Sequence, residues 1–323
     1  MYAILTDPVT HALSYSAVPT PAPRDDEVLI RIYAAGVNRA DLMQREGNYP
    51  PPPGCPEWMG LEISGEVCAA GPIAAKYWRI GDAVCALLGG GGYAEYVTVR
   101  YDMCMPIPAG VSMTEAAAIP EAFATAYLNL FREANARRGE TVLITAGGSG
   151  LSSVMIPMAK CAGLSVITTV RSAEKAAAIT GLGADVVLNT RVTPLPAYFA
   201  AHPMEVDVAV DCVGGPDVGD CLPYMARGGR WITIAALAGE KTAVDLRMLY
   251  VRGVRLVGST LRARDPAVKA DILSALVRDF FPQIENGTLR PTVCAVFPIR
   301  EAETAHDMLY HSENIGKVVL QVR

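Results

Sequence analysis

The sequence predicts an α/β fold in which a doubly wound parallel sheet follows an irregular, barrel-like β domain. From residue 141 onward, short apolar β-branched runs alternate with helical patterns, which is typical of a parallel sheet covered by helices. Before residue 120, strand-like runs are separated by Pro and Gly clusters. The 323 residues, 51% hydrophobic and 19% charged, suit two globular domains.

Five runs in the first part of the chain are predicted strands, namely YAILT, EVLIRIYAAGV, GEVCAAG, DAVCALL and YAEYVTV. The Pro50–Pro53 run is interpreted as a stiff loop, with a polyproline ligand as the alternative. At Ser112 the spacing of apolar residues changes to that of a helix, and Ser112 and Glu115 form a capping box at its start. Pro120 interrupts this helix before EAFATAYLNLFREAN resumes it. We expect a domain boundary here, after residue 121.

The second part contains the predicted strands TVLIT, SVITTV, DVVLN, EVDVAVD, RWITIA and RLVGST, with helices between several of them. Ser172 is the expected N-cap of the helix after SVITTV, and the glycines at 181–183 end it. Asp265 and Pro266 open a long amphipathic helix, which a strand, a helix and the final strand GKVVLQV follow. The predicted domains are therefore 1–121, 122–262 and a return to the first domain over 263–323.

A glycine-rich turn, AGGSG, joins TVLIT to the next helix. Small residues let the backbone bend tightly there, and the helix start near Gly150 offers unpaired N–H groups and a positive dipole end. This arrangement suits the pyrophosphate of a dinucleotide. Because the turn is not a clean G-x-G-x-x-G, a purely structural turn is the alternative.

Composition argues against several classes of protein. The formal charge of −5 and the pI near 5.5 disfavour a nucleic-acid surface, and the arginines at 252, 255, 262 and 264 are interpreted as a local solvated or phosphate-facing patch. Residues 141–159 carry no charge, but the glycine turn and Pro157 interrupt them, so we expect no membrane span. MYAILTDPVT does not resemble an export signal, which predicts a cytoplasmic protein with reduced thiols. The eight cysteines include no C-x-x-C, and the four histidines offer no well-spaced metal pair.

Several motifs in order resemble the zinc-independent quinone oxidoreductases of the medium-chain dehydrogenase/reductase superfamily. They are GVNRADLMQREGNYPPPPG, GLEISGEV, AAIPEAFATAY, AGGSG, DCVGG, GSTLRAR and NIGKVVL. The resemblance covers essentially the whole chain, and is closest to the mammalian stress-induced quinone reductase branch and more distant to zeta-crystallin. It implies a GroES-like catalytic domain, a Rossmann domain that binds NADPH, and a homodimer.

Three positions bear on the metal. Where zinc relatives carry Cys, His and Cys, the resemblance places Asn38, Leu61 and Glu121. Leu61 cannot ligate, and one Glu with one amide cannot complete a zinc site, so we expect no metal. Glu62 and Asp41 are interpreted as ion-paired or solvated carboxylates, with cation binding as the alternative.

The cofactor preference is predicted from the end of SVITTV. An NAD enzyme would place an acid there to hold the ribose 2′-OH, whereas this chain has Arg171 and Ser172. With Lys175, these residues suit a 2′-phosphate and so predict NADPH. An exposed arginine beside a helix-capping serine is the alternative. Thr190 stands where relatives often have a tyrosine that contacts the phosphate. Either this part of the phosphate site is lost, or Arg191 supplies the contact.

The resemblance implies further cofactor contacts, at Thr125, Ser149, Gly150, Leu151, Val213, Leu237, Asn314 and Lys317. Two features depart from the family pattern. Ser152 replaces the glycine that permits close packing of helix and strand, so its hydroxymethyl group needs room. Pro157 falls inside the same helix, where it costs about 3 kcal/mol unless the helix kinks.

For catalysis, the resemblance places Asn38, Tyr49 and Arg262 near the nicotinamide. Tyr49 is interpreted either as a hydrogen-bond donor to a quinone oxygen or as an aromatic lid. The predicted activity is NADPH-dependent reduction of small-molecule quinones, without nucleic-acid or membrane partners. Reduction of an enone or alkenal double bond is the first alternative, and a weakly active NADPH-binding structural or RNA-binding protein is the second.

Overall fold

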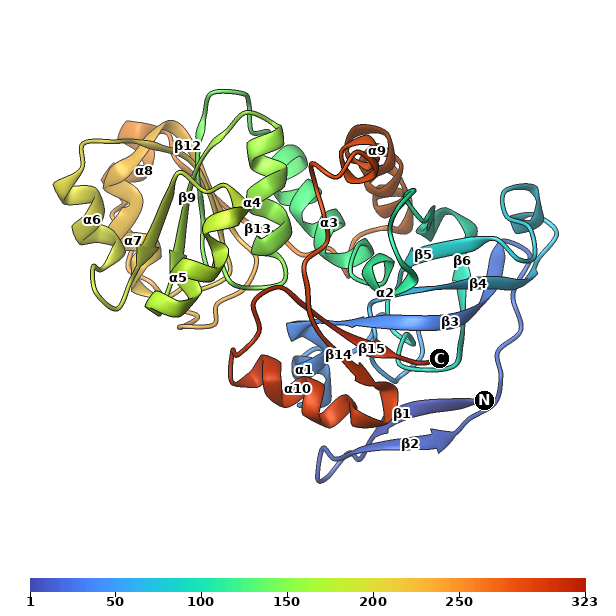
Figure 1. The fold of residues 1–323 in the computed structure, drawn as a ribbon. Helices are drawn as coiled ribbons and strands as arrows, with labels where there is room; N and C mark the ends of the chain where they lie inside the picture. The colour runs from blue at the N-terminus through green and yellow to red at the C-terminus, as the bar shows by residue number, and fades with distance from the viewer. The chain divides into compact units, whose positions relative to one another are not determined.

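The computed structural model describes residues 1–323, which divide into two compact units. Figure 1 follows the chain by colour. The first unit, called here the barrel unit, joins Met1–Ala124 to Leu261–Arg323, and the second, called the sheet unit, is Thr125–Thr260. The chain thus leaves the barrel unit after 124 and re-enters it at 261, where the sequence placed the boundaries after 121 and 262.

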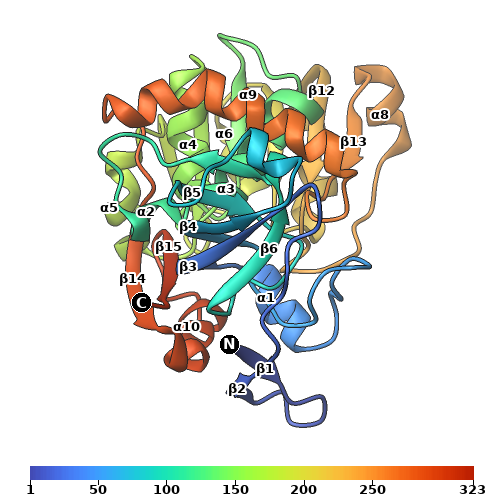
Figure 2. The same cartoon turned by 90° about the vertical axis from the view of Figure 1, so that its right-hand side faces the viewer.

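The barrel unit is built on a seven-stranded sheet with a separate two-stranded ribbon (Figure 2). The ribbon pairs β1 (Tyr2–Thr6) with β2 (Leu13–Ala17) in antiparallel fashion. The sheet has the order β14 (Val293–Pro298), β15 (Lys317–Gln321), β3 (Glu27–Val37), β4 (Glu62–Ala70), β5 (Ala83–Leu87) and β7 (Cys104–Pro106), and β6 (Tyr96–Arg100) also pairs with β3.

Strand β3 organises this sheet because it pairs with three others. Its final residue, Val37, lies opposite Val318 of β15, and Ala35 lies opposite Ile63 of β4. Strand β6 is antiparallel to the first half of β3. The register therefore brings the end of β3, the start of β4 and the start of β15 to one place, which is where the candidate site of this unit lies.

Helices and short 3-10 turns complete the barrel unit. They are α1 (Arg39–Arg45), η1 (Ala74–Lys76), η2 (Tyr101–Met103), α2 (Met113–Ala116), α3 (Pro120–Tyr127, which runs into the sheet unit), α9 (Pro266–Glu285), η6 (Ile299–Glu301) and α10 (Ala302–Tyr310). The predicted capping box is confirmed, since Ser112 accepts from the Glu115 N–H and the Glu115 carboxylate accepts from the Ser112 N–H. Asp265 caps α9 as expected.

The sheet unit confirms the predicted doubly wound fold. All six strands are parallel, in the order β10 (Val186–Asn189), β9 (Ser165–Val170), β8 (Thr141–Ile144), β11 (Val206–Asp211), β12 (Met225–Thr233) and β13 (Arg255–Gly258). The chain moves outward from β8 to β9 and β10, then returns to β11 on the other side of β8. The switch point is therefore the crevice between the carboxyl ends of β8 and β11.

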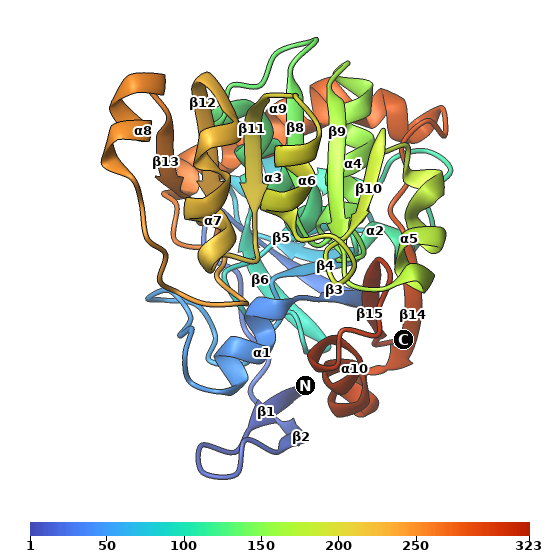
Figure 3. The same cartoon turned by 90° about the vertical axis from the view of Figure 1, so that its left-hand side faces the viewer.

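Helices cover both faces of this sheet. They are π-helix η3 (Leu128–Glu133), α4 (Ser152–Cys161), α5 (Ala173–Ile179), η4 (Thr180–Leu182), α6 (Leu195–Ala201), α7 (Pro216–Cys221), η5 (Leu222–Tyr224) and α8 (Leu246–Arg252). Figure 1 shows the sheet between α4 on one side and α6 and α7 on the other, and Figure 3 shows α6 and α7 from their own side. None of the helices is long and apolar enough to cross a membrane.

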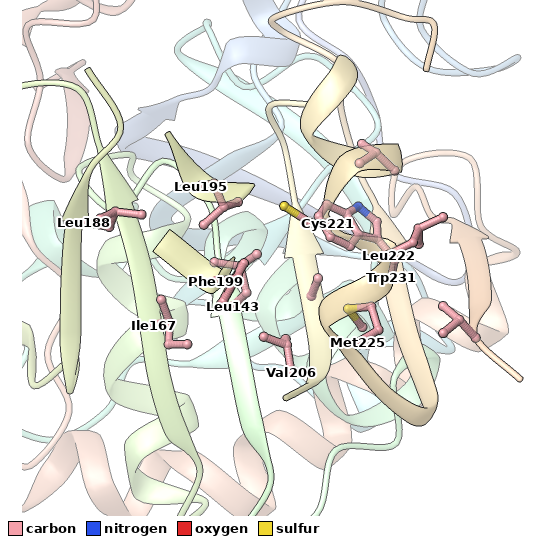
Figure 4. Packing of buried hydrophobic residues seen from close by; sticks show 13 residues of the cluster. Leu143, Ile167, Leu188, Leu195, Phe199, Val206, Cys221, Leu222, Met225 and Trp231 are labelled. Carbon is pink, nitrogen blue, oxygen red and sulfur yellow. The ribbon is translucent and has the colours of Figure 1, made fainter. Parts of the chain in front are cut away.

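One row of side chains forms the core beneath α6 and α7 (Figure 4). The register aligns Leu143, Ile167, Ala209 and Trp231 on four neighbouring strands, so their side chains share one face of the sheet. Phe199 of α6 packs on this row and is 2% exposed. Close packing of this row fixes the strands, and with them the loops at their carboxyl ends.

Candidate functional site

The glycine turn after β8 has no room for a larger side chain at Gly147. A Cβ atom at Gly147 would lie 2.5 Å from Thr168 Oγ1 and 2.7 Å from Ile179 Cδ1. Ala146 has a positive φ of 53°, a left-handed conformation that small residues tolerate best. The backbone thus approaches the sheet closely and leads into α4, as a pyrophosphate site at a helix start requires.

The two departures in α4 are accommodated by specific contacts. The Ser152 side chain is 2% exposed and its hydroxyl donates to the Thr145 carbonyl at 2.9 Å, so the hydroxymethyl group ties the helix to the end of β8. Ser149 accepts from the Ser152 N–H at 3.1 Å, which caps the first turn. Pro157 is the sixth residue of α4, and the helix continues through it to Cys161. The Ser149 side chain therefore stabilises the turn from within the protein.

Basic groups gather where β9 ends. Arg171 is exposed, and Lys175 reaches back over the glycine turn, since its Cδ would lie 3.3 Å from a Cβ on Gly148. The Ser172 hydroxyl accepts from the Lys175 N–H at 3.2 Å and caps α5, as the alternative interpretation expected. The cap fixes the start of α5, and with it the side chain of Lys175 that lies beside the glycine turn.

Three other residues of the sheet unit that were predicted to contact the cofactor make hydrogen bonds within the protein. The Thr190 hydroxyl donates to the Val170 carbonyl at 3.2 Å, so it serves the pairing of β9 with β10. Val213 follows β11, and its carbonyl accepts from the Ala238 N–H at 2.7 Å, which places Val213 beside the loop of Leu237. Thr125 opens the sheet unit, and its carbonyl accepts from the Asn129 amide at 2.7 Å.

A buried polar cluster lies in the barrel unit, where β3, β4 and β15 meet. Glu62 is 0% exposed and Lys317 is 2% exposed, and the Lys317 Nζ lies 2.5 Å from Glu62 Oε1. Asn38 joins them, because its Oδ1 accepts from Lys317 at 2.6 Å and its Nδ2 donates to Glu62 at 3.0 Å. The second Glu62 oxygen accepts from the Glu121 N–H at 2.8 Å. The ion pair thus fixes the amide of Asn38 from both ends.

Lys317 also donates to the Val37 carbonyl at 3.2 Å. An ammonium has three donors, so all three have partners inside the barrel unit. The contact of Lys317 with a cofactor stays a prediction, and this geometry does not favour it. Asn314 donates to the Gly316 carbonyl at 2.8 Å and shapes the turn that leads into β15.

A second buried chain of polar groups continues from Asn38. The Asn38 N–H donates to Asp41 Oδ2 at 2.8 Å, and the Tyr93 hydroxyl donates to the same carboxylate at 3.1 Å and meets His306 Nε2 at 3.2 Å. Burial raises the pKa of Asp41 to about 6 and lowers the pKa of His306 to about 3. His306 Nδ1 is buried without a hydrogen-bond partner in the protein. No sequence pattern pointed to Tyr93 or His306.

Tyr49 and Arg262 form a third feature of the barrel unit. The Arg262 guanidinium is 5% exposed and lies 5.1 Å from the centre of the Tyr49 ring. It donates to the carbonyls of Gly89 at 2.9 Å and Tyr49 at 3.1 Å and to Gln44 Oε1 at 2.6 Å. Burial, and then the charge of Glu121, raise the pKa of Tyr49. Arg262 thus holds the Tyr49 loop in place, and its predicted catalytic role stays a prediction.

Comparison with known proteins finds two family matches along the chain. Residues 24–109 match the family described as "Alcohol dehydrogenase GroES-like domain", and residues 150–277 match "Zinc-binding dehydrogenase". A quinone oxidoreductase-like protein 2 homolog from Nematostella vectensis is 30% identical over 311 residues, covering 92% of this chain and 82% of the relative. The chain belongs to the medium-chain dehydrogenase/reductase superfamily. It is therefore an oxidoreductase with a fold that binds nicotinamide dinucleotides.

Two further comparisons describe relatives of this oxidoreductase. Prostaglandin reductase-3 from Mus musculus is 29% identical over 318 residues, covering 94% of this chain and 83% of the relative. The quinone oxidoreductase from Thermus thermophilus, whose structure was also determined with NADPH, is 30% identical, with a TM-score of 0.84 and full coverage of both chains. The region matched to the zinc-binding family, 150–277, does not include Asn38, Leu61 or Glu121.

The carboxyl edge of the oxidoreductase's parallel sheet fits a dinucleotide. The glycine turn follows β8, at the switch point between β8 and β11, and close packing at Gly147 holds its backbone against Thr168 of β9. In the whole chain, no group of three or more His, Cys, Asp or Glu side chains is arranged to hold a metal ion. One residue at this edge, Asp211, was not predicted, although an acid directly after an apolar strand and before CVGG could have drawn attention to it.

Proposed function

We propose that this oxidoreductase transfers hydride from NADPH to quinones without a metal ion. The observation that carries the metal-free part of the proposal is the environment of the Lys317 ammonium. Oxygens of Glu62, Asn38 and Val37 surround it at 2.5, 2.6 and 3.2 Å. These are the oxygens that a cation at this position would need, and a positive charge already occupies the place between them. Leu61, which is 1% exposed, adds no ligand.

The occupation of this place by an ammonium bears on the choice of acceptor. An unactivated carbonyl needs a Lewis acid or a strong proton donor as its oxygen gains charge. A quinone spreads the incoming charge over a delocalised product and becomes an aromatic hydroquinone, so the acceptor supplies its own activation. The likeness to a quinone oxidoreductase of Thermus thermophilus supports this choice.

Tyr49 is the proposed donor to the quinone oxygen. Its pKa is raised above the ordinary value of about 10, so the neutral phenol donates a hydrogen bond near pH 7 and gives up its proton reluctantly. Arg262 lies against the ring and binds the Tyr49 carbonyl, which holds the phenol in one orientation. Water then supplies the proton that completes the hydroquinone.

NADPH is the proposed cofactor, and it supplies the hydride when bound. Arg171 directly follows β9, the position where an acid would hold the ribose of NAD, and Lys175 lies in the first turn of α5 and reaches the glycine turn. The glycine turn and the start of α4 would hold the pyrophosphate. Homodimerisation and a cytoplasmic location stay predictions from the resemblance and the sequence.

The test measures turnover by the purified protein with NADPH and NADH. The acceptors are 1,4-benzoquinone, 9,10-phenanthrenequinone, a 2-alkenal and no acceptor, and the metal content is measured by elemental analysis. We expect quinone reduction with NADPH, unchanged by a chelator, and little oxidation of primary alcohols. One zinc ion per chain that is lost together with activity would contradict the proposal.

Tyr49→Phe separates chemistry from packing. If the hydroxyl stabilises developing charge, turnover should fall by about 10-fold to 100-fold. Tyr310→Phe is the matched control, because Tyr310 is 62% exposed on α10. Equal turnover by the two variants would leave Tyr49 a lid without a chemical role.

Reduction of an activated C=C bond is the second candidate function. The likeness to prostaglandin reductase-3 favours it, because that relative is named as a reductase of prostaglandins. Faster turnover with the 2-alkenal than with either quinone would select it. If NADPH binds with micromolar affinity but no acceptor is reduced above the uncatalysed rate, a binding protein is the better description.

A further inference from the structure

Asp211 is a buried acid at the centre of the carboxyl edge of the sheet unit. It is the last residue of β11 and is 1% exposed. Its Oδ1 accepts from the Thr145 hydroxyl at 2.9 Å and from the Val213 N–H at 2.8 Å. Its Oδ2 accepts from the Gly214 N–H at 3.1 Å and from the Trp231 indole N–H at 3.3 Å. Four donors from three strand ends thus converge on one carboxylate.

These donors come from both walls of the crevice at the switch point. Thr145 follows β8 and begins the glycine turn, whereas Val213 and Gly214 lie in the loop after β11. The Thr145 hydroxyl also accepts from the Cys212 N–H at 3.0 Å, so it links the two walls a second time. The carboxylate therefore fixes the distance between the two loops that face the crevice.

The loop after β12 depends on the same residue. The Asp211 carbonyl accepts from the Ile234 N–H at 2.8 Å, and the Gly215 N–H donates to the Gly239 carbonyl at 2.9 Å. Gly214 has a φ of 68°, and a Cβ there would lie 2.9 Å from the Gly239 oxygen. The third loop is thus packed against a turn whose conformation the carboxylate holds.

An ionised carboxylate suits this place because it only accepts hydrogen bonds. An amide would turn N–H donors towards the donors that already converge there, and an apolar side chain would leave them unpaired at a cost of about 1–3 kcal/mol each. We infer that Asp211 is a positioning residue for the dinucleotide: it holds the two walls of the β8–β11 crevice in the binding geometry without touching the cofactor. The inference rests on the cofactor part of the proposed function and is independent of the acceptor.

The test uses two ligands that divide the site. NADPH spans the crevice, whereas adenosine 2′,5′-bisphosphate carries only the adenine half, which belongs at the end of β9. Asp211→Asn should weaken NADPH by about tenfold or more and leave adenosine 2′,5′-bisphosphate within about twofold, because preorganisation is lost only at the crevice. Dissociation constants are measured by calorimetry on the full-length protein.

Asp207→Asn is the matched control. Asp207 lies on the same strand but near its other end, where its carboxylate accepts from the Thr141 N–H at 2.8 Å. This variant should lose stability without losing affinity for either ligand. Thr145→Val should weaken NADPH in the same direction as Asp211→Asn, whereas Trp231→Phe, which removes a donor outside both walls, should not. These two variants carry the test if Asp211→Asn does not fold.

The possible outcomes are separable. Equal NADPH affinity in Asp211→Asn and the parent protein would overturn the inference, and so would equal weakening of both ligands. If the parent binds NADPH but reduces no quinone while Asp211→Asn still loses NADPH selectively, the proposed acceptor fails and the inference stands. A parent protein that binds no NADPH would overturn both.

Discussion

Removing one partner of the buried Glu62–Lys317 ion pair should destabilise the protein more than removing both. The two side chains are 0% and 2% exposed and lie 2.5 Å apart. Lys317→Met leaves a carboxylate in the interior with only the N–H groups of Asn38 and Glu121 as partners. An orphaned buried charge costs about 3–5 kcal/mol. For a domain of this size, that lowers the melting temperature by about 6–20 °C.

The double variant Glu62→Gln with Lys317→Met removes both charges at similar volume. Neutral replacement of a buried ion pair is often close to neutral for stability. We therefore expect the double variant to melt at a higher temperature than either single variant. Thermal and urea unfolding of the full-length protein, combined in a double-mutant cycle, measure the coupling.

An exposed pair between two strands of the same sheet is the control. Arg31 of β3 and Glu66 of β4 lie 3.0 Å apart, and each side chain is 42% exposed. Their coupling should be about 1 kcal/mol or less, because water screens both charges. If the effects of Glu62→Gln and Lys317→Met simply add, so that the double variant is the least stable, the reasoning from burial is refuted.

Lower pH should destabilise the fold through His306, whose folded-state pKa is about 3. Between about pH 6.5 and 3 the unfolded chain binds a proton at this residue that the folded chain does not, so the melting temperature should fall with pH. His306→Gln should flatten this part of a plot of melting temperature against pH. Asp41 acts in the opposite sense, because its folded-state pKa is about 6. As the pH falls from about 6 to 4, the folded state binds a proton there before the unfolded state does, which stabilises the fold. Asp41→Asn removes this stabilisation and should steepen the plot. Replacing Arg171 and Lys175 by Ala should weaken NADPH by about tenfold or more and leave NADH within about twofold, as measured by fluorescence titration. Ser152→Ala should lower the free energy of unfolding in urea by about 1–2 kcal/mol, because the Thr145 carbonyl loses the buried hydroxyl that donates to it.

Controls for these variants come from residues of the same type: His202 and Ser165 are exposed, and Lys160 is partly buried and ion-paired with Asp185. His202→Gln should leave the pH dependence unchanged, Lys160→Ala should leave both cofactor affinities unchanged, and Ser165→Ala should have a small effect on unfolding. Parallel plots of melting temperature against pH for His306→Gln and the parent would contradict the His306 prediction. Equal loss of NADPH and NADH affinity would contradict the Arg171 and Lys175 prediction, and an unchanged urea midpoint for Ser152→Ala would contradict the Ser152 prediction.

Local patterns in the sequence predicted most of the fold. The six parallel strands, the capping box at Ser112 and the start of α9 at Asp265 depend on short-range rules of hydropathy and capping, and the structure confirms each. Helix α1 was not predicted, because its first turn depends on a buried acid, Asp41, that accepts from the Asn38 N–H. Strand β7 was missed because it has only three residues.

The polar cluster was beyond the reach of local patterns because its members are far apart in the chain. Asn38 and Lys317 are 279 residues apart, and only the pairing of β15 with β3 brings them together. Lys317 was therefore assigned to the cofactor from its motif. By contrast, the basic residues at 171 and 175 and the turn at Gly148 are near neighbours in sequence, and the structure places Lys175 over that turn.

The position of β15 in the sheet has a consequence for synthesis on the ribosome. The sheet unit is one continuous segment, Thr125–Thr260, so it can fold as soon as that segment has emerged. The barrel unit cannot be completed then, since β15, the neighbour of β3 that carries the ammonium paired with Glu62, is made after the whole sheet unit.

Until Lys317 emerges, the nascent chain carries an uncompensated acid at a position that will become part of the interior. The domain that began first is therefore completed after the one inserted into it. A ribosome that stalls before it reaches Lys317 would leave the first domain open and the second half of β3 without its partner β15, a form that chaperones and proteases recognise.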